Sequence, residues 1–72
     1  MKKIKKIKIR INGSFKFVKN NTNLSDLLKT LKIPLKKVAI ELNREILDKK
    51  KLNKKILRNN DKIEIVNFIG GG

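Results

Sequence analysis

The chain has 72 residues, of which 39% are hydrophobic and 36% charged, and this length allows one domain with one hydrophobic core. It contains no cysteine and no histidine, which excludes disulfides, thiolate zinc sites and catalysis by a cysteine or histidine side chain. We therefore expect no metal site and no enzyme activity of its own. The remaining carboxylates are spread singly along the sequence: Asp26, Glu41, Glu45, Asp48, Asp61 and Glu64.

The net charge of +14 is typical of proteins that bind nucleic acid or another anionic surface. However, 17 of the 20 basic residues are lysine, and the chain has no tryptophan or tyrosine, so it is poor in the arginine forks and aromatic platforms that read nucleic acids. Lysine, isoleucine and asparagine share A/T-rich codons and together make 37 residues of the chain. We expect a composition bias to explain much of the charge, and nucleic-acid binding stays open as an alternative.

The amino-terminal residues are basic but are not followed by an apolar stretch, and no segment has the roughly 20 apolar residues that span a bilayer. These observations predict a cytoplasmic protein without a membrane partner. The self-repelling charge predicts a monomer when the chain is alone.

Residues 5–11 alternate isoleucine with lysine or arginine, which is the pattern of a half-buried strand. Asn12-Gly13 follows, and this pair favours a type I′ hairpin turn because both central residues need a positive φ. Phe15 and Phe17 alternate with polar residues in the return strand. We expect both rings to lie in the core.

A polar break at 20–23 leads into a helix with one apolar stripe. Thr22 or Asn23 can cap its amino end, and Asp26 is placed for a favourable interaction with the helix dipole and for a contact like a capping box. Pro34 is expected to end the helix. The stripe consists of four leucines: Leu24, Leu27, Leu28 and Leu31.

The alternation of Val38, Ile40 and Leu42 predicts a third strand over about 37–42. A turn at 43–45, a short edge strand at 46–47 and an irregular helical turn within 49–55 follow. Asp61 is expected to stabilise the turn at 59–61 rather than act as an acid, and the last strand covers 62–68. The basic residues of the helical turn are expected to form a solvated face, with electrostatic steering toward an acidic partner as the alternative: Lys49, Lys50, Lys51, Lys54 and Lys55.

This order of elements predicts an α+β fold in which one main helix covers a mixed sheet of four to five strands. With the first and last strands in the centre, the architecture is a β-grasp (ubiquitin-like) roll. We expect one domain over residues 1–72, with 69–72 as a flexible glycine tail.

The sequence ends in Phe68-Ile69-Gly70-Gly71-Gly72. Glycines lack a Cβ, so Gly70 and Gly71 can thread a narrow channel in a partner and present the Gly72 carboxylate to ATP. Adenylation would convert this carboxylate into a mixed anhydride that sulfide, a persulfide or an amine can attack. From the glycines alone, a disordered terminus or a cloning scar remains open.

Three stretches resemble the ubiquitin-like sulfur carriers and, among them, the thiamine-pathway carrier family, ThiS. They are the strand–turn–strand at 38–46, Leu57 with the turn into the last strand at 61–66, and the tail at 69–72. The family usually has glycine where this chain has Asn60, a residue that also tolerates positive φ. The lysine-rich amino terminus is a further departure.

The resemblance implies a carrier that acts as a protein cosubstrate and binds no cofactor. An E1-like (ThiF-like) adenylating enzyme would activate Gly72 with ATP and magnesium, and a cysteine desulfurase relay would supply sulfur for a thiocarboxylate. A ThiG-like thiazole synthase would then use this sulfur to build the thiazole ring of thiamine.

In the last strand, Ile63 and Ile65 are expected to face the helix, so that Val66 and Phe68 lie on the opposite face. Two exposed apolar side chains before the tail suggest that Val66, Phe68 and Ile69 bind the adenylating enzyme. The alternatives are a twist or bulge that turns Phe68 back into the core, or isolated apolar residues on the surface that bind nothing.

Several functions remain open at this point. A carrier like the small subunit of molybdopterin synthase (MoaD) would use the same chemistry, and protein modification through an isopeptide bond would use the same activated tail. A basic nucleic-acid-binding module or an interaction protein without chemistry would belong to a different class. Deletion of Gly72 separates these, because it abolishes a carrier and leaves a nucleic-acid binder active.

Overall fold

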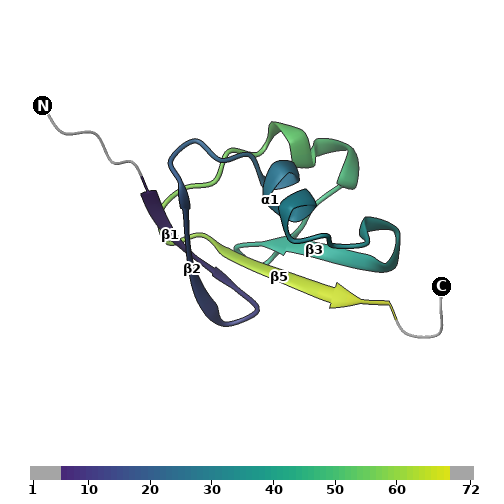
Figure 1. Ribbon diagram of the computed structural model, residues 1–72. Coiled ribbons are helices and arrows are strands. Elements are labelled where there is room, and N and C mark those ends of the chain that lie inside the picture. Colours follow the sequence, from purple (N-terminus) through teal and green to yellow (C-terminus); the bar gives the residue numbers. More distant parts are fainter. Residues whose placement is uncertain (1–5, 69–72) are drawn as a thin grey trace, which may run out of the picture.

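The computed structural model describes residues 6–68, and these form a five-stranded mixed sheet with one α-helix (Figure 1). The expected α+β roll of the β-grasp type is confirmed. The elements in chain order are β1 (Lys6–Ile11), β2 (Ser14–Lys19), α1 (Leu24–Thr30), the 3₁₀ turn η1 (Leu35–Lys37), β3 (Val38–Leu42), β4 (Glu45–Ile46), the 3₁₀ segment η2 (Lys49–Lys54) and β5 (Lys62–Asn67).

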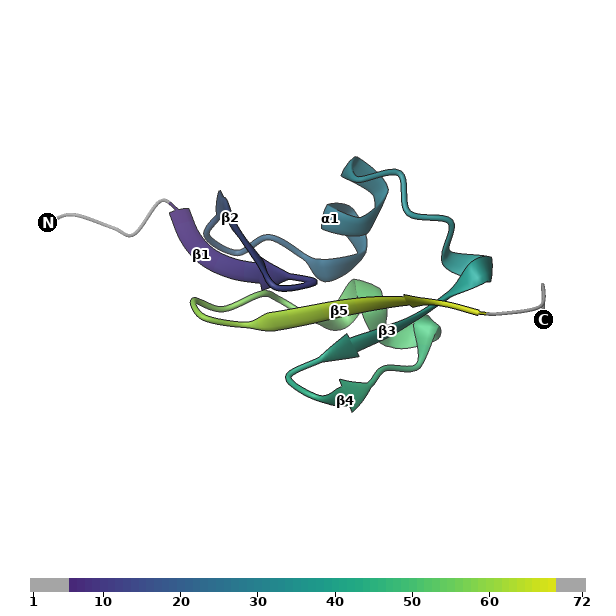
Figure 2. The same cartoon turned by 90° about the horizontal axis from the view of Figure 1, so that it is seen from below.

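The strand order in the sheet is β2-β1-β5-β3-β4. The first and last strands are neighbours inside the sheet, as expected, and β1 runs parallel to β5 while the other pairs are antiparallel. The end of β1 pairs with the start of β5, at Arg10–Lys62 and Ile11–Ile63. Consequently β5 extends beyond β1 and ends at the opposite end of the sheet from the start of β1 (Figure 2).

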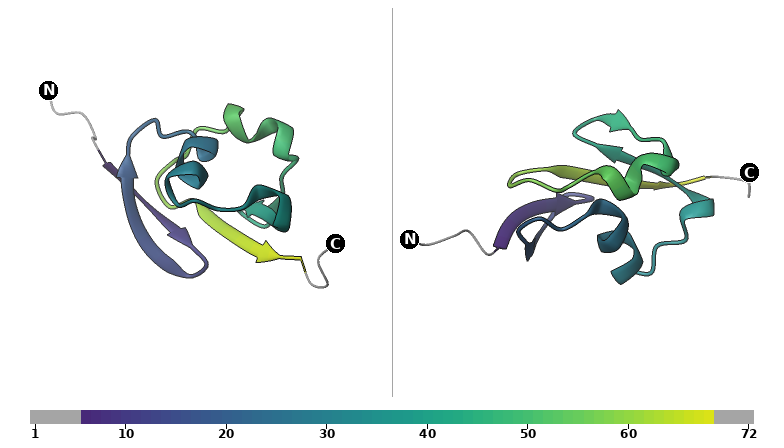
Figure 3. Two further views of the ribbon diagram at one scale, coloured as in Figure 1. Left: turned by 45° about the vertical axis from the view of Figure 1, so that its right-hand side comes forward. Right: turned by 90° about the horizontal axis from the view of Figure 1, so that it is seen from above.

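The core lies between one face of the sheet and the helical segments, because α1 and η2 lie on the same side of the strands (Figure 1, Figure 3). The opposite face of the sheet carries no helix in the part of the chain that the structure describes, and we call it the open face. The core residues come from β1, α1, β3, η2, the segment after η2, and β5: Ile7, Ile9, Leu24, Leu27, Leu28, Val38, Ile40, Leu52, Leu57 and Ile63.

The β1–β2 hairpin has the expected tight turn, with φ of 48° at Asn12 and 84° at Gly13. However, the prediction that Phe15 and Phe17 lie in the core is wrong, since their side chains are 58% and 65% exposed. The two-residue turn places Phe15 opposite Arg10 and Phe17 opposite Lys8. Paired residues share a face of the sheet, so both rings lie with the basic residues on the open face.

The amino end of α1 is capped by Asn23 rather than Thr22. Its Oδ1 accepts hydrogen bonds from the backbone N–H groups of Ser25 (2.7 Å) and Asp26 (3.4 Å). Asp26 therefore contributes its backbone to the cap. The Thr22 hydroxyl instead donates to the Lys19 carbonyl at 2.6 Å.

The carboxyl end of α1 is a Schellman motif, and the helix ends earlier than the expected stop at Pro34. Lys32 has a φ of 58°, and its N–H donates to the Lys29 carbonyl at 3.0 Å. The Ile33 N–H donates to the Leu28 carbonyl at 3.0 Å. These two bonds satisfy the carbonyls of Leu28 and Lys29 in the last turn of the helix, so that the helix is complete before the chain reaches Pro34.

The remaining elements follow the predicted order with small shifts. The edge strand β4 covers Glu45–Ile46, one residue earlier than expected, and the helical turn is the 3₁₀ segment Lys49–Lys54. Asn60 has a φ of 73°, which confirms that asparagine takes the conformation that favours glycine at this turn. No helix within residues 6–68 is long and apolar enough to cross a membrane.

Candidate functional site

The carboxyl-terminal half of β5 presents an apolar patch on the open face. Ile63 is buried and Ile65 is half-buried against the core, whereas Val66 and Phe68 are 48% and 47% exposed. The predicted exposure of Val66 and Phe68 is therefore confirmed. Ile46 of the edge strand is 74% exposed and pairs with Glu41, which in turn pairs with Glu64 of β5. We call Val66 and Phe68 the β5 patch; Ile46 lies in the row of Glu41 and Glu64 and is not part of it.

Two contacts fix Phe68 where the chain leaves the sheet. Its backbone N–H donates to the Lys37 carbonyl at 2.9 Å, which continues the pairing with β3 beyond the last residue of β5. The ammonium nitrogen of Lys49 lies 5.1 Å from the centroid of the Phe68 ring, and it also donates to the Leu35 carbonyl. The ring is therefore held at the surface and does not fold back into the core.

The sequence analysis assigns partner binding to Ile69, threading of the tail to Gly70 and Gly71, and the reactive carboxylate to Gly72. These four residues lie outside the described part of the chain. Phe68, the residue directly before them, lies one position after the last residue of β5 and belongs to the β5 patch.

The turn before β5 is held by Asp61, which confirms the structural role expected for this carboxylate. Its Oδ2 accepts from the Arg58 N–H at 2.8 Å, and its Oδ1 accepts from Asn43 Nδ2 at 3.0 Å. Asn43 Oδ1 accepts in turn from the Lys62 N–H at 2.9 Å. These bonds join the β3–β4 turn to the start of β5 and use both oxygens of Asp61.

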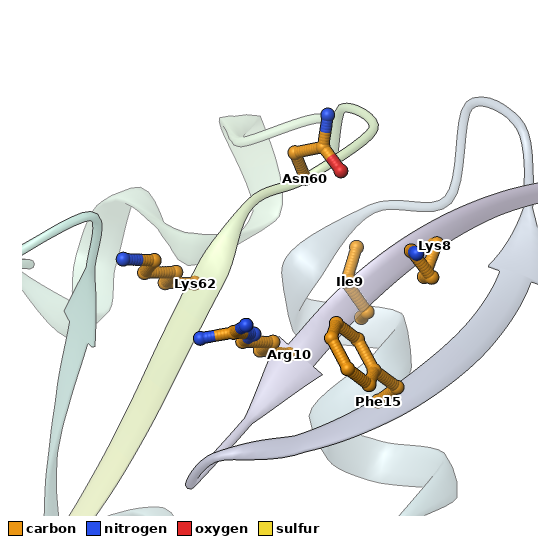
Figure 4. A pocket seen from close by; sticks show the side chains of 6 residues that line it. All are labelled: Lys8, Ile9, Arg10, Phe15, Asn60 and Lys62. Atoms are coloured by element: carbon orange, nitrogen blue, oxygen red, sulfur yellow. The ribbon is translucent and has the colours of Figure 1, made fainter.

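A second group of side chains on the open face was missed because Phe15 was expected in the core. The Lys8 Nζ and the Arg10 Cζ each lie 4.7 Å from the centroid of the Phe15 ring. These three residues line a shallow hollow with Ile9, Asn60 and Lys62 (Figure 4). The hairpin register was the available signal, since a two-residue turn already pairs Phe15 with Arg10.

Other charged residues match their expected places. The lysines of η2 and Lys55 are exposed, as predicted for a solvated face. Among residues 6–68, no three aspartate, glutamate, cysteine or histidine side chains come together in a group that could hold a metal ion.

The family model described as "ThiS family" matches residues 7–72. The chain belongs to the ThiS family. The sulfur carrier protein ThiS of Bacillus subtilis is 37% identical over 65 residues, which cover 89% of this chain and 98% of that protein. The crystal structure of the thiamine biosynthesis protein ThiS from Geobacter metallireducens superposes with a TM-score of 0.81 at 29% identity, over 92% of this chain and all of that one.

A second kind of relative is a larger protein. The thiazole synthase of Magnetococcus marinus is 36% identical over 66 residues, which cover 92% of this chain but only 20% of that synthase. These similarities confirm the expected resemblance to the thiamine-pathway sulfur carriers.

Proposed function

We propose that this member of the ThiS family carries sulfur for thiamine biosynthesis on the carboxylate of Gly72. The observation that carries the proposal is the position of Phe68, four residues before Gly72. The bond to the Lys37 carbonyl fixes Phe68, a member of the β5 patch, at the end of the sheet. A partner that binds this patch would therefore receive the glycine residues that follow.

The chemistry requires little from the chain itself. A carboxylate oxygen of Gly72 attacks the α-phosphorus of ATP in the adenylating enzyme, pyrophosphate leaves, and an acyl adenylate forms. Hydrosulfide then attacks the acyl carbon and AMP leaves, which gives the thiocarboxylate directly. If the sulfur comes as a persulfide of a desulfurase relay, the same attack gives an acyl disulfide. A second thiol then reduces this disulfide, which releases the thiocarboxylate and leaves a disulfide between the two thiols. Magnesium and ATP belong to the ThiF-like partner, so the chain needs no cofactor and performs no turnover of its own.

The acceptor is a thiazole synthase of the ThiG type. This assignment is supported by the thiazole synthase that contains a segment similar to nearly all of this chain, because a carrier and its acceptor gain effective concentration when they share one polypeptide. The carrier returns to the carboxylate after it donates its sulfur, which makes it a cosubstrate.

The adenylating enzyme binds Val66 and Phe68, together with Ile69. Exposed apolar side chains at the centre of an interface contribute most of the binding free energy when they become desolvated. Phe68 is suited to this role because the Lys49 ammonium already orients its ring.

The exchange of labelled pyrophosphate into ATP, catalysed by the adenylating enzyme, tests the activation step. We expect exchange to depend on this chain and to be lost when Gly72 is deleted, while the circular dichroism spectrum stays unchanged. Exchange that persists without Gly72 would show that another group is activated.

A further inference from the structure

The cations of the open face gather around one aromatic ring. Lys8 and Arg10 lie two residues apart on β1, Phe15 is opposite Arg10, and Lys62 of β5 is the parallel partner of Arg10. The Phe15 ring lies between the head groups of Lys8 and Arg10 (Figure 4), each 4.7 Å from its centroid. We call Lys8, Arg10, Phe15 and Lys62 the β1 cluster.

Charge is distributed unevenly across the open face. The hollow at the β1 cluster is lined by three cations and no carboxylate. The carboxylates of this face, Glu64 on β5 and Glu41 on β3, are paired with each other in the row that leads to Ile46. The face is therefore basic along β1 and at the start of β5, and apolar at the end of β5, with Glu64 at the border in a second hollow that it shares with Arg10, Arg44 and Lys62. A partner with an acidic surface for the β1 cluster and an apolar surface for the β5 patch would bind this face in one orientation.

The ligand of the β1 cluster is better matched by a protein surface than by nucleic acid. A base that stacked on Phe15 would have to displace one of the two cations that hold this ring. A nucleic acid that followed the open face along β5 would also meet Glu64 two residues after Lys62. Carboxylates of a protein, by contrast, can pair with Lys8 and Arg10 while the ring stays between them.

We propose that the β1 cluster is a second docking site, which binds an acidic patch of the protein that receives the tail. The inference rests on the proposed function, because it takes that partner to be the enzyme that binds the β5 patch. Lys62 lies five residues before the end of β5, which corresponds to about 16 Å along a strand. The partner should therefore carry its acidic patch about this far from the entrance to its tail channel.

Such a remote charged contact affects orientation and association rate more than the strength of the final complex. It leaves the tail free and aligns the end of β5 with the channel during the encounter. The number of lysines elsewhere on the chain makes a matched control necessary.

The test compares two full-length triple variants that each remove three positive charges. One is Lys8→Gln/Arg10→Gln/Lys62→Gln in the β1 cluster, and the other is Lys50→Gln/Lys51→Gln/Lys54→Gln in η2, on the opposite side of the sheet. Stopped-flow association with the adenylating enzyme at low salt should be slowed about tenfold by the first variant and less than about twofold by the second. Equal slowing by both would overturn the proposal, because only the total charge would then matter.

A titration with defined probes separates this proposal from the proposed function. In spectra of the ¹⁵N-labelled chain, an oligoglutamate peptide should shift the amides of β1 and β2, and the cluster variant should lose these shifts. The result that overturns the inference is a preference of the same amides for oligouridylate, or peptide shifts spread evenly over all lysine-rich segments. If no adenylating enzyme binds the wild-type chain, the proposed function fails. The titration still shows whether the β1 cluster binds an acidic peptide in preference to RNA.

Discussion

The side-chain amide of Asn12 pairs with both backbone hydrogen-bonding groups of Ile65. The Ile65 N–H donates to Asn12 Oδ1 at 2.7 Å, and Asn12 Nδ2 donates to the Ile65 carbonyl at 3.3 Å. Because the last backbone pair between β1 and β5 is Ile11–Ile63, the hairpin turn extends this ladder by one step with a side chain. The hairpin turn therefore holds β5 in place at Ile65, the residue directly before Val66 of the β5 patch.

Substitution at Asn12 separates these hydrogen bonds from the turn conformation. Asn12→Gly keeps the positive φ and removes the amide, so we expect the free energy of unfolding to fall by about 1 kcal/mol. Asn12→Ala loses the amide and also strains the backbone, which should bring the loss to about 2–3 kcal/mol. Urea unfolding followed by circular dichroism measures the free energy of unfolding of both variants. Equal values would contradict the claim that position 12 needs a positive φ.

Asp61 should matter for stability and not for chemistry. Asp61→Ala removes the acceptor for the Arg58 N–H and for Asn43 Nδ2, so the free energy of unfolding should fall by about 1–2 kcal/mol. At a temperature where the variant stays folded, the rate of adenylation should equal that of the wild-type chain. A large fall in this rate with intact structure would assign Asp61 a role in the reaction or in partner binding.

The exposure of Phe15 and Phe17 predicts a small energetic role in folding. Phe17→Thr should change the free energy of unfolding by less than about 1 kcal/mol, because threonine suits a strand and the ring is 65% exposed. Leu28→Ala in the core is the comparison, and it should cost about 2–5 kcal/mol. Losses of similar size in the two variants would place Phe17 in the core after all.

In the β1–β2 hairpin, the strands and the turn could be predicted from the sequence, but the buried face of the return strand could not. Alternation in 5–11 and the Asn12-Gly13 pair predicted both strands and the turn, because each depends on local chemistry. Alternation alone does not say which face of the return strand is buried. That choice follows from the register, which pairs Phe15 with Arg10 and leaves Val18 opposite Ile7 on the core side.

The end of α1 shows a similar limit. Pro34 marks a position that a helix cannot easily pass, but it does not tell where the helix stops. The Schellman motif ends α1 before it, with a lysine at a positive φ. Residues other than glycine rarely take this conformation, so composition gave no sign of it.

For the functional site, the parity of β5 was enough to predict that Val66 and Phe68 are exposed. The contacts of Phe68 with Lys37 and Lys49 could not be predicted, because they join segments 19 to 31 residues apart that only the fold brings together. The β1 cluster could not be predicted from alternation alone either, because that pattern does not say that Phe15 faces the same side of the sheet as Lys8 and Arg10.

Phe68 should be important for binding the adenylating enzyme. Phe68→Ala should raise the KM for this chain about tenfold, equivalent to about 1.4 kcal/mol, because the partner loses an exposed apolar contact. Ile56→Ala is the matched control, since Ile56 is 50% exposed but lies outside the β5 patch. Unfolding curves show whether either variant is destabilised. A stable Phe68→Ala chain with an unchanged KM would exclude the patch from docking.

The most direct test of the account is the intact mass of the chain after incubation with the adenylating enzyme, ATP, magnesium and sulfide. We expect a mass increase equal to the exchange of one oxygen for one sulfur. It should be located in the carboxyl-terminal fragment and be absent when Gly72 is deleted. An unchanged mass with an enzyme that adenylates other members of the ThiS family, or a sulfur found elsewhere in the chain, would contradict the claim that Gly72 carries the sulfur.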